Sequence, residues 1–362
     1  MKRGLVAAAV ALLAVSACTS AEQDQARTTS AEPASDSGTA SEPTVVEASE
    51  DLMQWVAAPG STDNTLTTNG TWFLTVSASG TEYRLDGPEQ SFGSGADAVG
   101  DGPTAITNAL LNPDWAVVVR QDQTGAKPDV AEVTNLSTGL QFPIDEGTDI
   151  PTTTGGTWAL GGDTLVHATV TDDDQTCLAA IDLEAQESTL GWCADEGQGF
   201  TAAHVTEAGT TLLTFDDAVP ACRTVAATAG EDLEPFDGAA ECEGWDSSAV
   251  SDDTTVWSTV PQDDQDAPAE FFAREGGSFY DLGRGTSGTL VPCAGAAYFV
   301  RDPAKESAPA QVVRWQDREL SVVYEAPPGQ SYLDAPRCGD RALVVTAHNE
   351  SGDEQVMAAL GG

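Results

Sequence analysis

Basic residues are scarce in this chain. It carries 15 Lys and Arg residues against 58 Asp and Glu, which gives a formal net charge of −43 at pH 7. Such a surface repels phosphate backbones, so the composition excludes nucleic-acid binding. The charge favours solubility and is compatible with cationic partners or divalent ions, although a lineage with acidic proteins throughout would explain it equally well.

Residues for nucleophilic and zinc chemistry are also few. The chain has three histidines and neither a C-x-x-C nor a G-x-S-x-G motif. A catalytic triad needs a His between a nucleophile and a carboxylate, and a zinc site needs clustered ligands at short spacing. We expect His167 in the core, and the sequence identifies no partner for His204 or His348. We therefore expect no catalytic residues, no metal site and no cofactor.

Two aspartate-rich runs, Asp172–Asp174 and Asp263–Asp266, carry oxygen ligands that calcium prefers. Neither has the spacing of an EF-hand loop with its glycine and distal glutamate, so we interpret both as solvated turns. Carboxylate pairs for glycoside hydrolysis are not indicated at any particular position, because acidic residues occur throughout the chain.

Long apolar runs are absent apart from residues 5–15, which follow Lys2 and Arg3 and are too short to span a bilayer as a mature helix. The run ends in Val15-Ser-Ala-Cys18, which resembles the lipobox of bacterial, actinobacterial-type lipoproteins. The resemblance implies a signal peptide over residues 1–17, removal of that peptide, and diacylation of Cys18, for example with palmitate. Two acyl chains provide a stable membrane anchor on the extracytoplasmic side. Ordinary signal cleavage after Ala17 is the alternative.

Residues 19–50 are rich in Ser, Thr, Ala, Glu and Pro, and Arg27 is their single basic residue. A segment of this composition cannot bury enough apolar surface to offset its ordering entropy. We expect residues 18–50 to comprise the lipidated Cys18 and a disordered tether with a mean span of about 30 Å.

A short pattern recurs seven times in the remainder, residues 51–362. Each copy has a Gly or Asp turn, an anchor residue and a strand-like apolar run. The anchors are spaced 43, 49, 47, 44, 42 and 44 residues apart, and they are Trp72, Trp115, Thr164, Thr211, Thr255, Ala297 and Arg341. Four strands fit each copy, and no helical period is present. A period of about 40–50 residues built from strands is typical of propeller blades.

The repeat resembles a seven-bladed β-propeller of the WD40/YVTN-like type, which implies an all-β fold of four-stranded blades. An array of β-sandwiches is the alternative. The seventh copy lacks its fourth strand, and residues 52–57 form an extra strand before the first copy. We expect this N-terminal strand to complete the last blade, because a closed ring protects strand edges.

Six cysteines remain besides Cys18, and an even number in an exported chain indicates disulfides. Two pairs lie at the start of the third and near the end of the fourth strand of their blades, where antiparallel pairing brings them together. The third pair lies at the ends of adjacent inner strands. The predicted disulfides are Cys177–Cys193, Cys222–Cys242 and Cys293–Cys338.

Eight tryptophans divide into two groups. Trp72, Trp115 and Trp257 lie at or next to anchors, and we expect them to pack between blades. The others include four near expected strand ends, where an aromatic side chain can also line a binding face: Trp158, Trp192, Trp245 and Trp315.

The sequence favours a non-enzymatic lipoprotein, monomeric and anchored to the cell membrane, whose propeller binds or scaffolds an unknown protein or glycan of the envelope. The alternative is a carbohydrate-active enzyme, a glycoside hydrolase or lyase, with carboxylates in the central funnel. Fold alone does not decide between them, because propellers host both roles.

Overall fold

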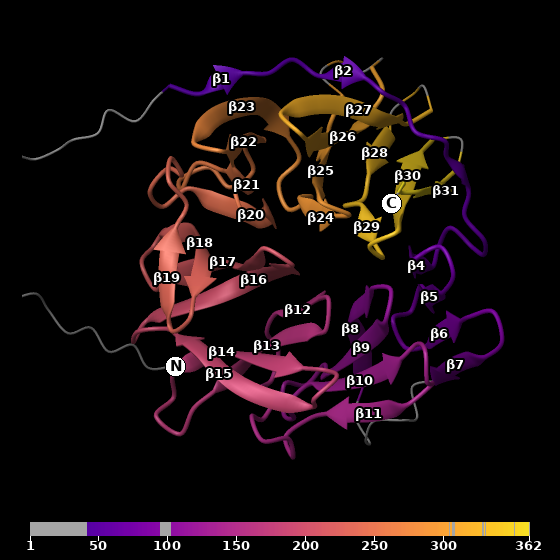
Figure 1. Ribbon diagram of the computed structural model, residues 1–362, viewed down its shortest axis with the longest axis vertical. Helices are drawn as coiled ribbons and strands as arrows, with labels where there is room; N and C mark the ends of the chain where they lie inside the picture. The colour runs from indigo at the N-terminus through magenta and orange to yellow at the C-terminus, as the bar shows by residue number, and fades with distance from the viewer. Residues whose placement is uncertain are drawn as a thin grey trace, which may run out of the picture. The chain divides into compact units, whose positions relative to one another are not determined.

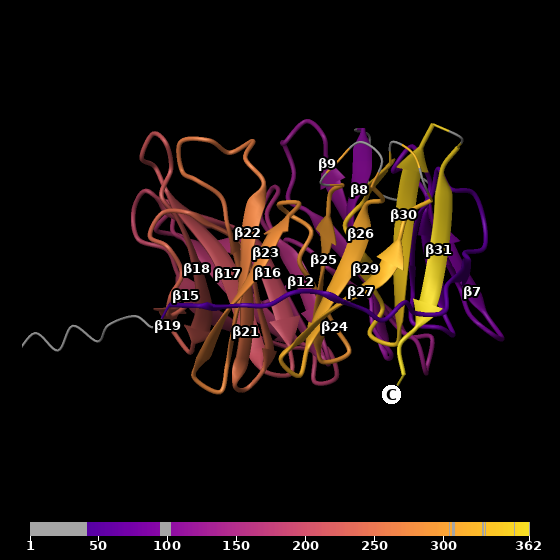
Figure 2. The same cartoon turned by 90° about the horizontal axis from the view of Figure 1, so that it is seen from above.

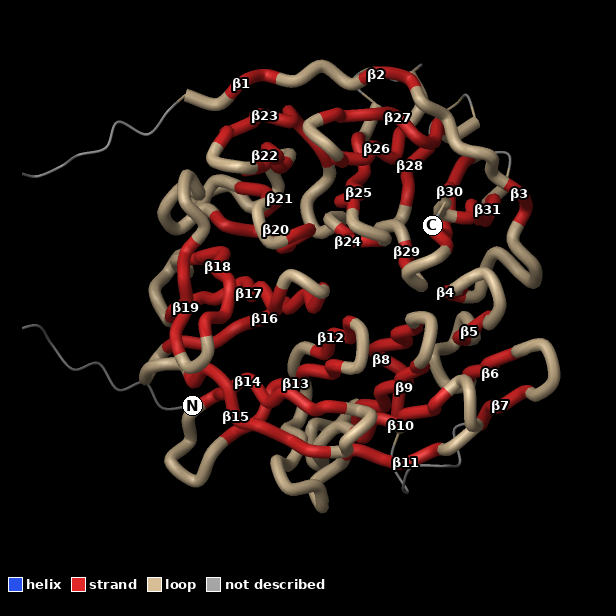
Figure 3. Tube along the Cα trace, in the orientation of Figure 1, coloured by secondary structure: helices blue, strands red, loops and turns tan. Residues whose placement is uncertain are grey.

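The structure is a computed structural model that describes residues 42–94, 103–303, 305, 308–327, 329, 331–350 and 352–361. The described residues form seven β-sheets arranged as blades around a central axis, with no helix among them (Figures 1 and 3). The predicted seven-bladed propeller is therefore confirmed. The predicted signal peptide, Cys18 and most of the predicted tether lie outside the described residues.

Blades are numbered in chain order, and in each one the chain runs from the axis of the ring to its rim. Blades 1 to 4 each consist of four consecutive strands: β4 (Thr65–Thr68), β5 (Phe73–Val76), β6 (Tyr83–Asp86) and β7 (Ser91–Ser94); β8 (Thr104–Leu111), β9 (Trp115–Asp122), β10 (Val130–Asn135) and β11 (Gln141–Ile144); β12 (Trp158–Gly161), β13 (Thr164–Val170), β14 (Thr176–Asp182) and β15 (Glu187–Cys193); β16 (Gln198–Thr206), β17 (Gly209–Asp216), β18 (Arg223–Ala229) and β19 (Asp232–Pro235).

Blades 5 to 7 have the same core of strands and receive additions from the N-terminus. Their own strands are β20 (Gly244–Ser251), β21 (Thr254–Thr259), β22 (Ala269–Glu275) and β23 (Ser278–Gly285); β24 (Val291–Cys293), β25 (Ala296–Arg301), β26 (Gln311–Gln316) and β27 (Glu319–Glu325); β28 (Ser331–Leu333), β29 (Arg337–Cys338), β30 (Ala342–Asn349) and β31 (Glu354–Ala359). In blade 7, β28 and β29 both pair with β30 and together replace a continuous inner strand.

The anchors lie at or within three residues of the start of the second strand of each blade, as the repeat predicts. These strands are buried on both faces because neighbouring blades stack against them. The buried apolar side chains form six clusters, and each cluster is shared by two consecutive blades, from blades 1 and 2 to blades 6 and 7. The anchor tryptophans Trp72 and Trp115, and Trp257 beside its anchor, belong to these clusters, which confirms their predicted packing role.

Residues 44–58 form an N-terminal strap along the outer edges of three blades. Its strands β1 (Thr44–Val45) and β2 (Ser49–Glu50) pair in parallel with β23 and β27, and β3 (Val56–Ala57) pairs antiparallel with β31. Figure 2 shows the strap crossing the rim between the two loop faces. The predicted completion of blade 7 by the N-terminus is confirmed.

The strap also corrects two boundaries. The strand on blade 7 is shorter than the predicted residues 52–57, because the Asp51 and Met53 amides donate to carbonyls of blade 6. The tether predicted to reach residue 50 ends earlier, since β1 and β2 already lie on the propeller. Composition misses these strands because their stability comes from the blade edges with which they pair.

Three disulfides join the predicted pairs of cysteines. Cys177 and Cys193 are directly opposite in β14 and β15, and Cys293–Cys338 joins the inner strands of blades 6 and 7. Cys222–Cys242 differs in its setting, because Cys242 lies beyond the end of β19 in a turn with φ 63°. The chain leaves the sheet at Pro235, so the fourth strand ends before it reaches the cysteine.

Candidate functional site

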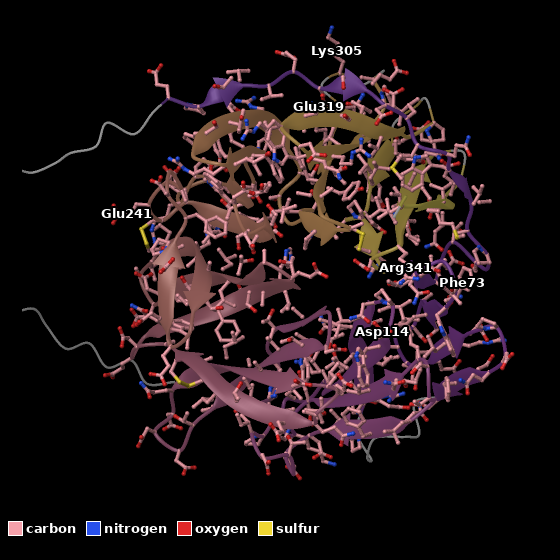
Figure 4. All side chains as sticks on the ribbon, viewed as in Figure 1. Phe73, Asp114, Glu241, Lys305, Glu319 and Arg341 are labelled. Atoms are coloured by element: carbon pink, nitrogen blue, oxygen red, sulfur yellow. A yellow bond between two sulfur atoms is a disulfide. The ribbon has the colours of Figure 1, made fainter. Side chains whose placement is uncertain are left out.

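The inner strands, which lie nearest the axis of the ring, carry few charges. Along β4, β8, β12, β16, β20, β24, β28 and β29, the described residues include one carboxylate, Asp246, one guanidinium, Arg337, and one imidazole, His204. Figure 4 shows the exposed Glu241 and Glu319 toward the outer part of the ring, whereas Asp114 and Arg341, in the turns that follow β8 and β29, lie nearer its middle. The described residues also contain no cluster of three or more His, Cys, Asp or Glu side chains able to hold a metal ion. The inner strands therefore offer no carboxylate pair.

Asp246 is the carboxylate in the inner strands, and its environment is unusual. Its Oδ2 accepts hydrogen bonds from Ser258 Oγ at 2.8 Å and from the Gly288 backbone N–H at 3.0 Å. Burial raises the pKa of Asp246 to about 6 despite these two bonds. A carboxyl with this pKa can exchange a proton near neutral pH. Glycoside hydrolysis needs a second carboxylate facing it, and the described inner strands do not supply one.

Trp245, which precedes Asp246 in β20, packs against an arginine. The Arg223 guanidinium stacks on the Trp245 ring, with 4.3 Å between Cζ and the ring centroid. Arg223 also donates through Nη2 to the Val260 carbonyl oxygen at 3.1 Å. Burial lowers the pKa of Arg223, and the charge of Glu243 opposes that shift. These contacts hold the ring in place as a packed side chain.

Blade 7 carries a second candidate, a hollow of about 440 Å³ at one end of its sheet. We call it the blade-7 hollow. It is formed where β28 pairs with the end of β30, beside the turn that leads to β31. The residues that line it are Pro303, Ser331, Tyr332, His348, Asn349, Glu350 and Asp353.

His348 is held between two carboxylates at this hollow. Its Nε2–H donates to Asp334 Oδ2 at 3.2 Å, and its Nδ1–H donates to Asp353 Oδ2 at 3.0 Å. Both ring nitrogens act as donors only in the imidazolium form. Partial burial alone would lower the pKa of His348, but the hydrogen bonds and charges of Asp334 and Asp353 outweigh it and raise the pKa. The arrangement therefore favours a positively charged imidazolium.

Tyr332 forms an aromatic wall of the blade-7 hollow. Its ring stacks on His348 with centroids 4.6 Å apart and an angle of 19° between the planes, yet the residue is 60% exposed. The neighbouring Ser331 is only 7% exposed, and its buried Oγ has no hydrogen-bond partner among the described residues. The hollow therefore combines an accessible ring with several carboxylates.

The other sequence-based candidates are not brought together into a site. His167 is fully buried in β13 and stacks on Trp158, as expected of a core residue. Burial lowers the pKa of His204 to about 4, and its Nδ1 has no partner among the described residues. Asp172–Asp174 and Asp263–Asp266 lie in turns between strands.

The tryptophans near strand ends contribute mostly to the core. Trp158 and Trp315 are 5% and 1% exposed, so they line no accessible face. Trp192 is partly buried beside Phe200, and Trp245 packs as described above. At the blade-7 hollow the accessible aromatic is Tyr332, which sequence analysis did not single out. The feature that identifies Tyr332 is the register of β28 on β30, which places it opposite His348 and is not readable from the sequence.

Comparisons with known proteins agree on the fold. No family model and no curated protein matches the chain. The β-propeller domain of the trilobed protease from Pyrococcus furiosus is 10% identical, with a TM-score of 0.51 over 89% of this chain and 97% of that one. The oligogalacturonate lyase from Vibrio parahaemolyticus is 11% identical, with a TM-score of 0.52 over 87% and 99%.

A prolyl endopeptidase is also similar, at 14% identity and a TM-score of 0.50. The match covers 85% of this chain but 47% of that one, so this chain spans about half the length of the endopeptidase. Similarities at these identities show the propeller fold alone. Among the described residues, no helix is long and apolar enough to cross a membrane.

Proposed function

We propose that this protein is a lipid-anchored, extracytoplasmic binding module that presents its propeller to a protein or glycan of the cell envelope. The observation that carries the proposal is the position of the strap. The chain reaches the propeller along the rim and pairs with the outer edges of blades 5, 6 and 7. A tether joined at the rim leaves the loops of both faces uncovered by the strap (Figure 2).

The three disulfides support an oxidising compartment for the folded domain. Within the described inner strands Asp246 is the single carboxylate, so these strands do not themselves contain the pair that glycosidases use. In this proposal Cys18 carries the acyl chains and residues 1–17 are removed.

Metabolic labelling with a palmitate analogue, followed by membrane fractionation, tests the anchoring. We expect wild-type protein to be labelled and to sediment with membranes, and the Cys18→Ala variant to be unlabelled and released. The Ser20→Ala variant serves as the matched control and should behave as wild type. An unlabelled wild-type chain, cleaved after Ala17 with an unmodified Cys18, would contradict the proposal.

A further inference from the structure

We propose that the blade-7 hollow binds a cationic group, an ammonium or guanidinium such as a lysine or arginine side chain of a partner. This inference rests on the proposed role of the propeller as a binding module and names the chemistry that one of its surfaces recognises. It does not depend on the lipid anchor.

The charges around the hollow favour a cation. Asp353 and Glu350 line it, and Asp334 approaches it through His348. The imidazolium of His348 balances one of these three carboxylates, and the charge of Arg337 acts on Asp334. The group as a whole therefore remains negative. A ligand without net charge would gain less from this field than a cation, which is attracted by it.

The hydrogen-bonding groups point to the same chemistry. Both N–H groups of His348 are already used by Asp334 and Asp353, so the imidazolium offers no free donor to a ligand. The carboxylates of Asp353 and Glu350 can only accept. A ligand must therefore supply donors, and an ammonium or guanidinium supplies three to five of them without any acceptor.

The apolar wall fits the stem of a long cationic side chain. Tyr332 stands 60% exposed at the hollow, and Pro303 lines it as well. Lysine and arginine bury their methylene stems along apolar surface while the charged head stays in a polar environment. One face of the Tyr332 ring already stacks on the His348 imidazolium. We therefore assign the ring to packing against the stem, with the carboxylates holding the charged head.

Titration of the purified full chain with tetralysine tests the proposal. With ¹³C-labelled histidine, the three histidines give three resonances. We expect the His348 resonance to shift saturably, while those of the buried His167 and His204 stay in place. Tetralysine with acetylated side chains and neutral maltotetraose should leave all three unchanged.

Variants distinguish binding of tetralysine at this hollow from its nonspecific attraction to an acidic chain. Glu350→Gln should weaken tetralysine binding about two- to five-fold, the range of an exposed ion pair. Glu187→Gln, which removes the same charge from the exposed blade-3 strand β15, should bind as wild type. Tyr332→Ala should weaken binding, and Tyr332→Phe should preserve it with an unchanged circular dichroism spectrum.

Three outcomes would overturn the proposal. They are no saturable His348 shift with tetralysine, an equal shift with acetylated tetralysine or maltotetraose, and an equal loss in the Glu350→Gln and Glu187→Gln variants. None of these outcomes affects the labelling of Cys18, so failure here and failure of the anchoring proposal are distinguishable.

Discussion

The joint that closes the ring differs from the six other joints between blades. Each of those six buries an apolar cluster, for example the stacked rings of Phe271 and Phe299, whose centroids are 4.0 Å apart between blades 5 and 6. None of the six clusters spans blades 7 and 1. There, Gly339 lies against the Thr68 backbone, where an added Cβ would come within 2.2 Å of its carbonyl oxygen. The Gln355 side chain also donates to the Asn64 carbonyl oxygen at 3.1 Å.

The contrast shows two ways to hold neighbouring blades. Apolar clusters stabilise six joints by removing side chains from water. Close backbone contacts occur at some of these joints too, as between Gly161 and Val205, but at the closing joint the described residues form no such cluster beside them, and the strap spans the joint. The strap pairs with blade 7 through β3 and then continues directly into blade 1 at β4. The closing joint is thus bridged by the chain itself.

Removal of the strap should have the largest effect on stability. A chain that begins at residue 58 loses the pairing of β1, β2 and β3 and the packing of Trp55, whose Nε1–H donates to the Val323 carbonyl oxygen at 2.8 Å. We expect a loss on the order of 5 kcal/mol in the free energy of unfolding. Urea unfolding checks this, with a chain that begins at residue 42 as the control of unchanged stability. Equal stability of the two chains would show that the ring closes without the strap.

Single substitutions should separate the two kinds of joint. Phe299→Ala removes a fully buried ring from the joint of blades 5 and 6 and should cost about 3–5 kcal/mol. Gly339→Ala should cost about 1–3 kcal/mol, because one of two closely packed backbones must shift. Gly361→Ala meets no atom within 4 Å and serves as the control. An equally small loss of stability in Gly339→Ala and Gly361→Ala would contradict the close backbone packing at the joint of blades 7 and 1.

The stability lost on removal of a disulfide should increase with the length of the loop that the disulfide closes. Cys293–Cys338 spans 45 residues and links two blades, while Cys177–Cys193 spans 16 within one blade. Replacing either pair by alanines should cost about 2–4 kcal/mol, and loop entropy makes the longer loop costlier by about 1 kcal/mol. Thermal unfolding of the two double variants measures the order, and a larger loss from the shorter loop would argue against the entropic explanation.

Substitution of His348, whose contacts lie within blade 7, should have the smallest effect on stability. Its pKa is raised in the folded protein, so its contribution to stability is complete below the unfolded value of about 6.5 and is lost as pH rises through the folded value. We expect His348→Gln to lower the melting temperature slightly at pH 5.5 and to have no effect at pH 9. A difference that grows with pH would contradict the imidazolium assignment.

The sequence predicts the parts of the fold that repeat. The period locates the second strands, because each copy places an apolar run after a turn, and the Cys177–Cys193 and Cys293–Cys338 pairs follow from that frame. Asn69 and Asn112, three residues before their anchors, were missed. Each caps its turn and donates through Nδ2 to a carbonyl oxygen of the next blade.

The parts that do not repeat could not be predicted in the same way. The strands β1 and β2 are two residues long, and their partners lie more than 230 residues away. The blade-7 hollow depends on the interruption between β28 and β29 and on a turn that places Asp353 against His348. No local sequence pattern encodes these contacts, because they depend on the way in which β28 and β29 pair with β30 in place of a continuous inner strand.

Hydrogen exchange of the strap amides tests the central claim that the strap closes the ring and joins the tether to the propeller. The amides of Val46, Asp51, Met53 and Ala58 donate to blade carbonyl oxygens at 2.8–3.0 Å. In the full chain we predict that they exchange slowly, on the timescale of the amides of β31. Exchange at the rate of an unstructured peptide, with the blades still protected, would contradict the account.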